Sequence, residues 1–439
     1  MLNKLYWMNK FTFTRKQKIL MKFYLQFFIL CVIGGVGSAC FSLATNVAYD
    51  WCIKIYHFIG FGMLFYTPIL FVLTAYILRN YFPYAGGSGL PQGYALDVYE
   101  RDKLYQTYSL KTMFGKVILT FMSILGGASL GREGPTIQIC ASVFSSMRNI
   151  SAKRKKFLIR IGSGIGIAAA FNAPLGGIVF AIEEYIQHSD SKMNYALLSG
   201  IAIAGYFAIL ITGDYSYMGG VDVNNLSYNW HVVFVSLFAG IVCGLAGALF
   251  TWLIVLLSVD RGTAIDKLRK KNYLLTAFIF GILVACLGLF TQGVSFGNGA
   301  ETTRAFLNSN VHVPWYYAIS KAIGALFSVA AAVPGGYFST SLSIGAGLMG
   351  AMHSFLPSDI SIQQLYLLGM VGFLAAITDA PITAVVMIIS IVADTQHFAM
   401  PLVFTSVIAA RVAGFFGESV YRQQVLIYVD KIPQHNKAG

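Results

Sequence analysis

The residue best suited to chemistry is Glu133, a carboxylate within an otherwise apolar part of the chain. It lies between Gly131 and Gly134, and Pro135 follows, a pattern typical of a helix start. The first N–H groups of a helix are unpaired and carry about half a positive charge. A carboxylate there can occupy the place of a small anion and leave it when protonated. Glu133 is therefore a candidate gate and proton carrier, the alternative being a structural ion pair with Arg132.

Two further glycine-rich segments, residues 86–91 and 335–340, interrupt apolar stretches in the same way. Several helix N-termini that converge would bind an anion without a lysine or arginine at the site. Such binding is weak enough for rapid release, which conduction requires. For one segment, glycines that only allow tight packing are an equal explanation. For three segments together, an anion pathway explains the pattern better.

A second pair of carboxylates, Glu183 and Glu184, ends the apolar helix expected over residues 176–182. We expect this pair near the cytoplasmic side, because a basic loop precedes it by only one pair of helices. An exposed helix end is the alternative. A metal-dependent membrane enzyme or receptor that uses these carboxylates with His188 is a further alternative, but no second group of ligands supports it. We therefore expect no enzyme activity, no metal and no cofactor.

The elements that carry these residues are expected to be membrane helices. Of 439 residues, 56% are hydrophobic and only 11% are charged, whereas a soluble chain has about 25% charged residues. A helix needs roughly 20 apolar residues to cross a bilayer. Apolar runs close to or above this length occur at 23–44, 195–211, 233–259 and 273–290. The chain is predicted to be an integral protein of the inner (plasma) membrane.

The net charge of +13 is concentrated in three short clusters, within residues 4–22, 148–160 and 261–271. Short loops rich in lysine and arginine stay in the cytoplasm, so we expect both termini there. Nucleic-acid binding is excluded because the clusters lie beside membrane segments and no basic domain stands apart. The six cysteines lie singly in or beside apolar segments, which indicates packing rather than disulfides.

The chain contains an internal repeat. Residues 131–136 and 336–341 match at an offset of 205 positions (131 to 336), and residues 172–180 match 379–387 at an offset of 207 (173 to 380). Two matches at nearly the same offset predict two structural halves with the site at their interface. An odd number of helices per half would give inverted repeats and an even number parallel ones. Hydropathy alone leaves this open.

These residues resemble a known family, the CLC chloride channels and proton-coupled chloride transporters. The resemblance covers roughly residues 35–421. It implies an all-α polytopic fold with two inverted repeats of tilted and broken helices, and a homodimer with one pathway per subunit. The segments that carry it are residues 87–91 (GSGLP, similar to the family's GSGIP), 131–135 (GREGP, unchanged), 171–184 (the helix that ends in the inner proton-transfer glutamate), 336–340 (similar to GxFxP) and Tyr421, at the place of the central tyrosine.

The resemblance also implies the role of each site residue. Glu133 would be the external gating and proton-transfer residue, and Glu184, with Glu183 beside it, the internal proton-transfer residue. The central anion would be coordinated by the hydroxyls of Ser88 and Tyr421 and by the backbone N–H groups of Tyr337 and Phe338. The remaining motif residues, which would shape selectivity, are Gly87, Gly89, Pro91, Gly131, Arg132, Gly134, Pro135 and Gly336.

A carboxylate at Glu184 resembles the coupled exchangers and favours a chloride/proton antiporter, with chloride and protons as partners. A passive voltage- or pH-gated chloride channel is the alternative. Ser88 resembles chloride-selective members, since nitrate-preferring members carry a proline there. Fluoride exporters generally lack both the inner glutamate and the central tyrosine, so Glu184 and Tyr421 disfavour fluoride.

Two departures from the family pattern are Thr340, in place of the proline of GxFxP, and Ser390, where many members keep a glutamate. Thr340 can cap a helix start through its hydroxyl, and the change at Ser390 is interpreted as structural. The pair of cytoplasmic nucleotide-binding (CBS) domains of most eukaryotic members is not seen, which implies the prokaryotic type. We expect a cytoplasmic tail over residues 1–17, a transport domain over 18–421 (repeats at about 18–212 and 230–421) and a short tail over 422–439.

Overall fold

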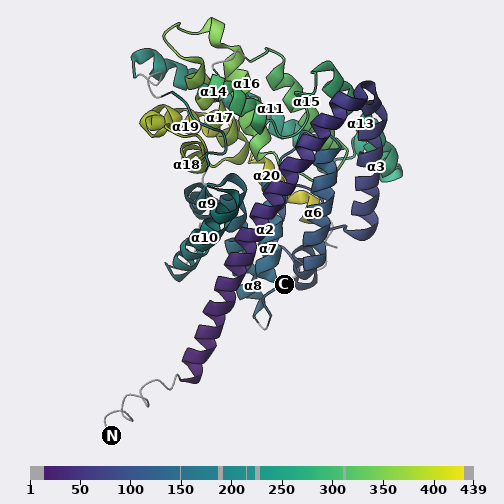
Figure 1. The fold of residues 1–439 in the computed structure, drawn as a ribbon, viewed down its shortest axis with the longest axis vertical. Coiled ribbons are helices and arrows are strands. Elements are labelled where there is room, and N and C mark those ends of the chain that lie inside the picture. Colours follow the sequence, from purple (N-terminus) through teal and green to yellow (C-terminus); the bar gives the residue numbers. More distant parts are fainter. Residues whose placement is uncertain are drawn as a thin grey trace.

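All regular elements that the structure, a computed structural model, describes are helices (Figure 1). The described residues are 14–148, 150–185, 191–213, 215–222, 228–309 and 313–429. Most of both predicted tails, and His188, lie outside the described residues.

The helices of the first half extend to residue 212. They are α2 (Arg15–Ile59), α3 (Met63–Tyr81), α4 (Leu90–Tyr94), α5 (Arg101–Thr107), α6 (Leu110–Leu125), α7 (Glu133–Ser145), α8 (Ala152–Phe171), α9 (Pro174–Phe180), the π-helical turn η4 (Ala181–Tyr185) and α10 (Ser191–Thr212), with 3-10 turns η2 (Gly60–Gly62) and η3 (Ala95–Asp97).

The second half begins at residue 230. Its helices are α11 (Trp230–Ser258), α12 (Ala264–Lys271), α13 (Tyr273–Phe290), α14 (Ala300–Ser309), α15 (Tyr317–Ala330), α16 (Phe338–Ala351), α17 (Ile362–Thr378), α18 (Pro381–Ile391), α19 (Ala399–Gly414), α20 (Val420–Gln424) and α21 (Leu426–Val429), with 3-10 turns η6 (His353–Phe355) and η7 (Gln396–Phe398).

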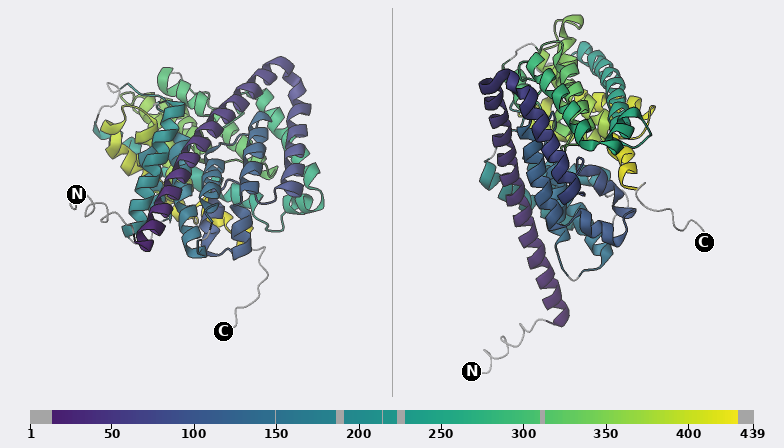
Figure 2. Two further views of the ribbon diagram at one scale, coloured as in Figure 1. Left: turned by 60° about the horizontal axis from the view of Figure 1, so that its bottom comes forward. Right: turned by 90° about the vertical axis from the view of Figure 1, so that its right-hand side faces the viewer.

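Five helical stretches of the described chain are long and apolar enough to cross a membrane, which confirms the prediction of a membrane protein. Three of them agree with predicted apolar runs to within a few residues. The first run, expected at 23–44, is instead the middle of the 45-residue helix α2. Thr14 begins this helix with a capping box to Gln17, so the basic residues from Arg15 to Lys22 are helical as well. The start of α2 extends beyond the rest of the molecule (Figure 2).

Equivalent helices pack together in the two halves. In the first half, α7 packs on α8 and α2 packs on α10; in the second half, α16 packs on α17 and α11 packs on α19. Corresponding helices also meet across the halves, α3 with α13 and α9 with α18. Helices α8 and α17 both end at a left-handed residue, Asn172 and Asp379, and a proline then starts the next helix. The repeat found in the sequence is thus a repeat of structure.

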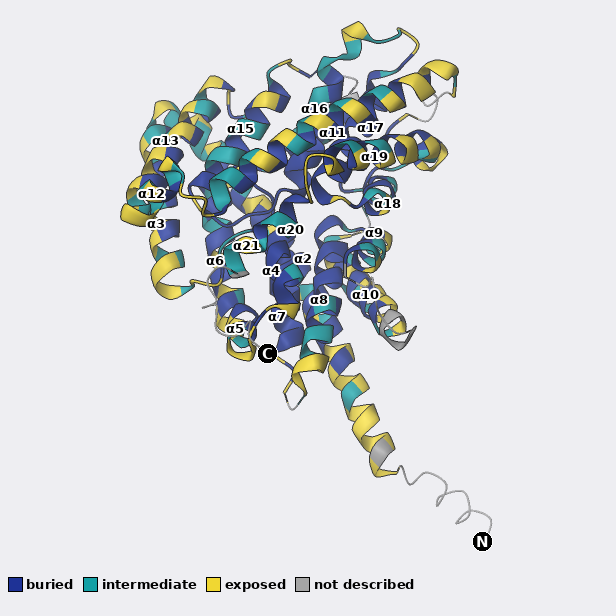
Figure 3. Cartoon of the chain, turned by 180° about the vertical axis from the view of Figure 1, so that it is seen from behind, coloured by how far each residue is buried: buried dark blue, intermediate teal, exposed yellow. Residues whose placement is uncertain are grey.

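The core lies where the halves meet. Every residue of α7 and of α17 is buried, and α16 is buried along nearly its whole length. Exposed residues gather on the outward faces of the peripheral helices and at the start of α2 (Figure 3). Many of them are large and apolar, such as Phe61, Phe65 and Trp252. An apolar outer surface fits a helix bundle surrounded by lipid.

Candidate functional site

Glu133 is the first residue of α7, as the sequence predicted, and its side chain is fully buried. The segment before it pairs with the matching segment of the second half. Gly131 and Gly336 exchange two backbone hydrogen bonds, each of 2.7 Å, in an antiparallel bridge. The two segments matched at an offset of 205 therefore face each other, an arrangement expected of inverted repeats. The starts of α7 and α16 meet at the position of the Glu133 carboxylate.

Three side-chain donors converge on one oxygen of this carboxylate. The Ser339 hydroxyl donates to Oε1 of Glu133 at 2.5 Å, the Tyr217 hydroxyl donates at 3.2 Å, and Nδ2 of Asn298 donates at 3.4 Å. Nδ2 of Asn298 also donates to the Tyr217 hydroxyl at 3.1 Å. All three donors are neutral, and they come from α16, from the segment that joins the halves and from the turn before α14. The gate candidate is thus held by hydroxyl and amide groups and not by a cation.

Arg132 points away from its neighbour. Its guanidinium donates to the backbone oxygen of Ser42 at 2.8 Å and to Oδ1 of Asn46, both on α2. The ion pairs among the described residues do not include one between Arg132 and Glu133. The alternative of a structural ion pair is therefore not supported.

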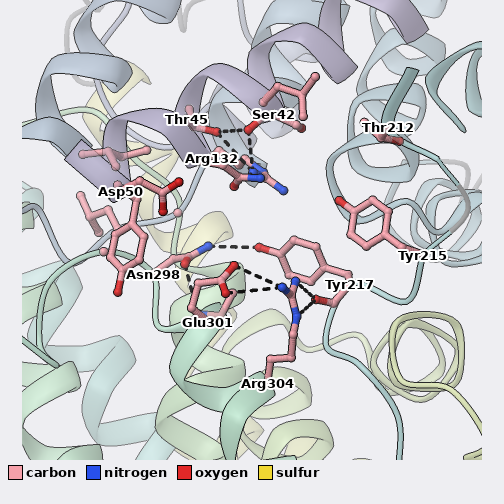
Figure 4. Close-up of a pocket in the computed structure, with 18 residues that line it drawn as sticks. Ser42, Thr45, Asp50, Arg132, Thr212, Tyr215, Tyr217, Asn298, Glu301 and Arg304 are labelled. Atoms are coloured by element: carbon pink, nitrogen blue, oxygen red, sulfur yellow. Dashed lines mark hydrogen bonds and ion pairs between the residues drawn. The ribbon is translucent and has the colours of Figure 1, made fainter. Parts of the chain in front are cut away.

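A cavity of about 300 Å³ lies beside the gate and is called here the Arg132 cavity. Its polar lining is partly shown in Figure 4, where Tyr217 and Asn298 point toward each other and Arg304 reaches the backbone of Tyr217 from below. Arg304 donates to the backbone oxygen of Tyr217 at 2.5 and 3.1 Å, and the Arg132 guanidinium lies 5.4 Å from the centre of the Tyr217 ring. Tyr217 is therefore fixed from two sides. The lining also includes two carboxylates, Asp50 and Glu301.

Ser88 lies at the turn before α4, packed against the start of α7. A Cβ atom at Gly134 would be 2.2 Å from the backbone oxygen of Ser88, and one at Gly89 would be 2.4 Å from the backbone oxygen of Gly134. Only glycine allows so close a backbone approach. Gly89 also has a φ of 102°, and Pro91 occupies the first turn of α4. The Ser88 hydroxyl is buried and has no hydrogen-bond partner within the described part of the chain, so it is available to a ligand.

The other predicted ligands of the central anion lie on elements next to this turn. Tyr421 is buried on α20, which packs against α4. Its ring stacks on the ring of Tyr337 at 6.1 Å. Phe338 is the first residue of α16, so its N–H belongs to the orphan donors of that helix start. The structure brings together the glycine-rich turns before α4 and α7, the start of α16, and α20.

The two adjacent carboxylates, Glu183 and Glu184, have different environments. The helix that was expected to end before them continues through η4, a π-helical turn, and π turns are frequent at functional sites. Glu184 is buried and accepts a hydrogen bond from the Tyr94 hydroxyl. Glu183 accepts from the backbone N–H of Ile382 at 3.2 Å and from both the N–H and the hydroxyl of Thr383 at 2.6 Å. Glu183 therefore caps α18 of the opposite half.

The two departures from the family pattern have distinct contacts. The Thr340 hydroxyl lies 3.5 Å from the backbone oxygen of Ser129, in the opposite half, and the start of α16 has no side-chain cap. The expected capping role of Thr340 is thus replaced by a contact between the halves. Ser390 donates to the backbone oxygen of Val386 in its own helix at 2.7 Å. Among the described residues, no group of three His, Cys, Asp or Glu side chains is placed to hold a metal ion.

Sequence reasoning missed several residues of the site. Tyr217 lies between the two predicted repeats, where no site residue was predicted, and the Ser339 side chain was not singled out. Asn298 and the buried lysines Lys116 and Lys321 could have been identified from the internal repeat. The lysines are 205 positions apart (116 to 321), the offset of the repeat already found. Asn298 lies between two glycines, as Ser88 does.

A family model described as voltage gated chloride channel matches residues 69–414. The chain is 28% identical over 373 residues to the H(+)/Cl(-) exchange transporter ClcA of Citrobacter koseri. This alignment covers 80% of this chain and 76% of the relative. A protein of the same name from Klebsiella pneumoniae matches to the same extent. These relatives are transporters and not enzymes.

Solved structures show the same fold. A slow cyanobacterial Cl-/H+ antiporter superposes with a TM-score of 0.79 at 23% identity, over 93% of this chain and 98% of the other. A eukaryotic CLC transporter superposes with a TM-score of 0.73 at 22% identity, over 93% of this chain and 75% of the other. A CLC-type fluoride/proton antiporter superposes with a TM-score of 0.76 at 18% identity, over 94% of this chain and 99% of the other. The all-α polytopic CLC fold is thus confirmed, and the chain belongs to the voltage gated chloride channel (CLC) family.

Proposed function

We propose that this protein is a chloride/proton antiporter of the inner membrane. The observation that carries the proposal is the fully buried Glu133 carboxylate, held at the meeting point of two helix starts by three neutral side-chain donors. The family membership and the exchange activity named for the ClcA relatives support it. A buried carboxylate in a membrane segment costs about 2.5–3.5 kcal/mol and is retained for function.

Glu133 would act as the gate. In its ionised form the carboxylate accepts the three hydrogen bonds and fills the place that an anion would take. Oε2 has no hydrogen-bond partner among the described residues and can take a proton. The proton removes the negative charge and weakens all three hydrogen bonds, so the neutral side chain would leave and the donors would become available to chloride. When chloride departs, the carboxylic acid loses its proton and the resulting carboxylate returns to the three donors. One residue would thus couple anion movement to proton movement.

Glu184 would be the second proton station. It is buried and lies near α4, because Tyr94 of that helix donates to its carboxylate. The basic residues 148–160 flank the start of α8, beyond the end of α7 that is opposite to Glu133. By the positive-inside rule this end would face the cytoplasm. Glu133 and the Arg132 cavity would then face outward, and both termini would be cytoplasmic.

Chloride would pass the central site on its way. The buried Ser88 hydroxyl, the Tyr421 hydroxyl and the N–H groups of Tyr337 and Phe338 would coordinate it. Neutral donors bind an anion weakly enough for release. We propose that the transport domain covers residues 18–421, with repeats at about 18–212 and 230–421, and that two copies form a homodimer with one pathway each.

The proposal is tested by ion flux in liposomes that contain the purified full chain. A chloride gradient should drive protons uphill, with the membrane potential clamped by potassium and valinomycin. Chloride flux without proton movement would favour a passive channel instead. Glu133→Gln should lose proton movement and retain chloride flux, because glutamine keeps the shape and the acceptor oxygen but cannot take up and release a proton. Proton coupling that persists in this variant would contradict the gate assignment.

A further inference from the structure

The turn that carries Asn298 repeats the turn that carries Ser88. Gly87 and Gly297 have φ values of 68° and 65°, and Gly89 and Gly299 have values of 102° and 80°. All four are in the left-handed region that favours glycine. Ser88 and Asn298 therefore occupy the same position between two glycines, one in each half of the molecule.

Buried lysines hold the two turns in the same way. Nζ of Lys116 donates to three consecutive backbone oxygens, those of residues 85–87, at 2.6 to 3.1 Å. Nζ of Lys321 donates to those of residues 295–297 at 2.7 to 3.1 Å. Three acceptors match the three donors of an ammonium group. Both lysines are fully buried, so each stabilises the turn of its own half from within the protein.

The Asn298 side chain is oriented for donation. Its Oδ1 accepts from the backbone N–H of Ala300 at 3.1 Å, which directs Nδ2 toward the gate. Nδ2 then lies 3.4 Å from Oε1 of Glu133 and 3.1 Å from the Tyr217 hydroxyl. Asn298 also lines the Arg132 cavity, so an ion in that cavity can reach it.

We propose that Asn298 is the second-half counterpart of Ser88 as an anion ligand, and that with Tyr217 and Ser339 it forms the outer anion site of this protein. The inference rests on the proposed function and adds the donors of that site. The three groups bind the Glu133 carboxylate in the closed state. They bind a halide ion in its place once the carboxylate leaves, because both are anions that accept hydrogen bonds from the same donors. Since no donor is charged, the outer ion leaves readily.

The experiment uses the Glu133→Ala background, in which the outer site is free of the carboxylate. Bromide binding is measured by titration calorimetry on the full chain in detergent, and anomalous diffraction from bromide-soaked crystals shows which position each ion occupies. The background should bind two ions. Adding Asn298→Ala should weaken the outer ion about tenfold, the effect expected for one hydrogen bond to an ion. Asn298→Ser, which copies the first half, should restore part of this loss.

Asn298→Asp keeps the shape and the acceptor for Ala300 but replaces the donor with a negative charge, so the outer ion should be lost while the central ion remains. Asn308→Asp is the control. It adds the same charge on α14 and keeps an oxygen that can accept from the N–H of Gly220. Outer binding that is unchanged in Asn298→Asp, or a central ion weakened as much as the outer one, would overturn the inference. If the Glu133→Ala background binds no ion at either position, the proposed anion pathway itself fails.

Discussion

Replacing Glu183 by glutamine should lower stability and leave transport coupled. The sequence grouped Glu183 with Glu184 as proton-transfer residues, but both Glu183 oxygens are engaged by donors at the start of α18. A proton on Glu183 would remove its negative charge and weaken all three of these hydrogen bonds. We therefore expect Glu183 to hold α9 and α18 together across the halves, and Glu184 to carry the proton.

The size of the effect follows from the three contacts. Oε2 of Glu183 accepts from the N–H and the hydroxyl of Thr383, and Oε1 accepts from the N–H of Ile382. Glutamine keeps one acceptor oxygen and replaces the other with an amide nitrogen, so at least one bond and the favourable charge at the helix start are lost. Loss of a helix cap costs about 0.5–2 kcal/mol, and a charge at a helix terminus is worth about 0.3–1 kcal/mol. We expect Glu183→Gln to destabilise the protein by about 1–2 kcal/mol.

Stability is measured by titrating the protein in mixed micelles with a denaturing detergent, and coupling by the liposome flux assay. Thr383→Val is the matched control, because it removes only the hydroxyl donor and should cost about half as much. The double variant should cost less than the sum of the two single variants, since both remove the same contact. Glu184→Gln should show the opposite pattern, with proton movement lost and stability little changed. A Glu183→Gln protein of normal stability that no longer moves protons would refute this reasoning.

Three other variants test the framework of the site. Lys321→Met leaves three buried carbonyl oxygens without their donor and should destabilise the protein by about 3 kcal/mol in the same denaturant titration. Lys116→Met should destabilise it by a similar amount. In bromide-soaked crystals, Lys116→Met should weaken binding of the central ion and Lys321→Met binding of the outer ion. Thr340→Pro should fold and transport ions at a rate close to that of the parent, because residue 340 is in the first turn of α16, where an N–H has no helical acceptor; loss of folding in a gel-filtration assay would contradict this.

The sequence predicted the parts of the site that depend on local backbone geometry. Glycines beside a carboxylate or a proline predict a helix start, and Glu133 is the first residue of α7. The repeat predicted that residues 131 and 336 would have matching roles, and they are paired by two backbone hydrogen bonds. Local patterns suffice here because each feature is set by a few consecutive residues.

The contacts of the gate could not be predicted in this way. Tyr217 reaches Glu133 only because its segment is tied down by distant residues. Arg304 donates to its backbone oxygen, and the N–H of Met218 donates to the backbone oxygen of Ile391 at 2.8 Å. Such a position depends on packing between elements far apart in the chain. The resemblance to a family did not predict the position of Tyr217 either. A resemblance assigns roles only to motif residues, and Tyr217 lies outside every motif.

The repeat, extended beyond its motifs, relates the two proposed anion sites to each other. Ser88 and Asn298 lie in equivalent turns, and each turn is held by a buried lysine at an equivalent position. Yet the first turn presents its hydroxyl without a protein partner in the described chain, whereas the second presents its amide to the Glu133 carboxylate. The carboxylate belongs to the first half, and the residue at the matching position of the second half is Phe338. One half therefore supplies the ionisable group and the other supplies donors around it, so in the proposed mechanism a symmetric backbone would give a pathway with a gate at its outer end.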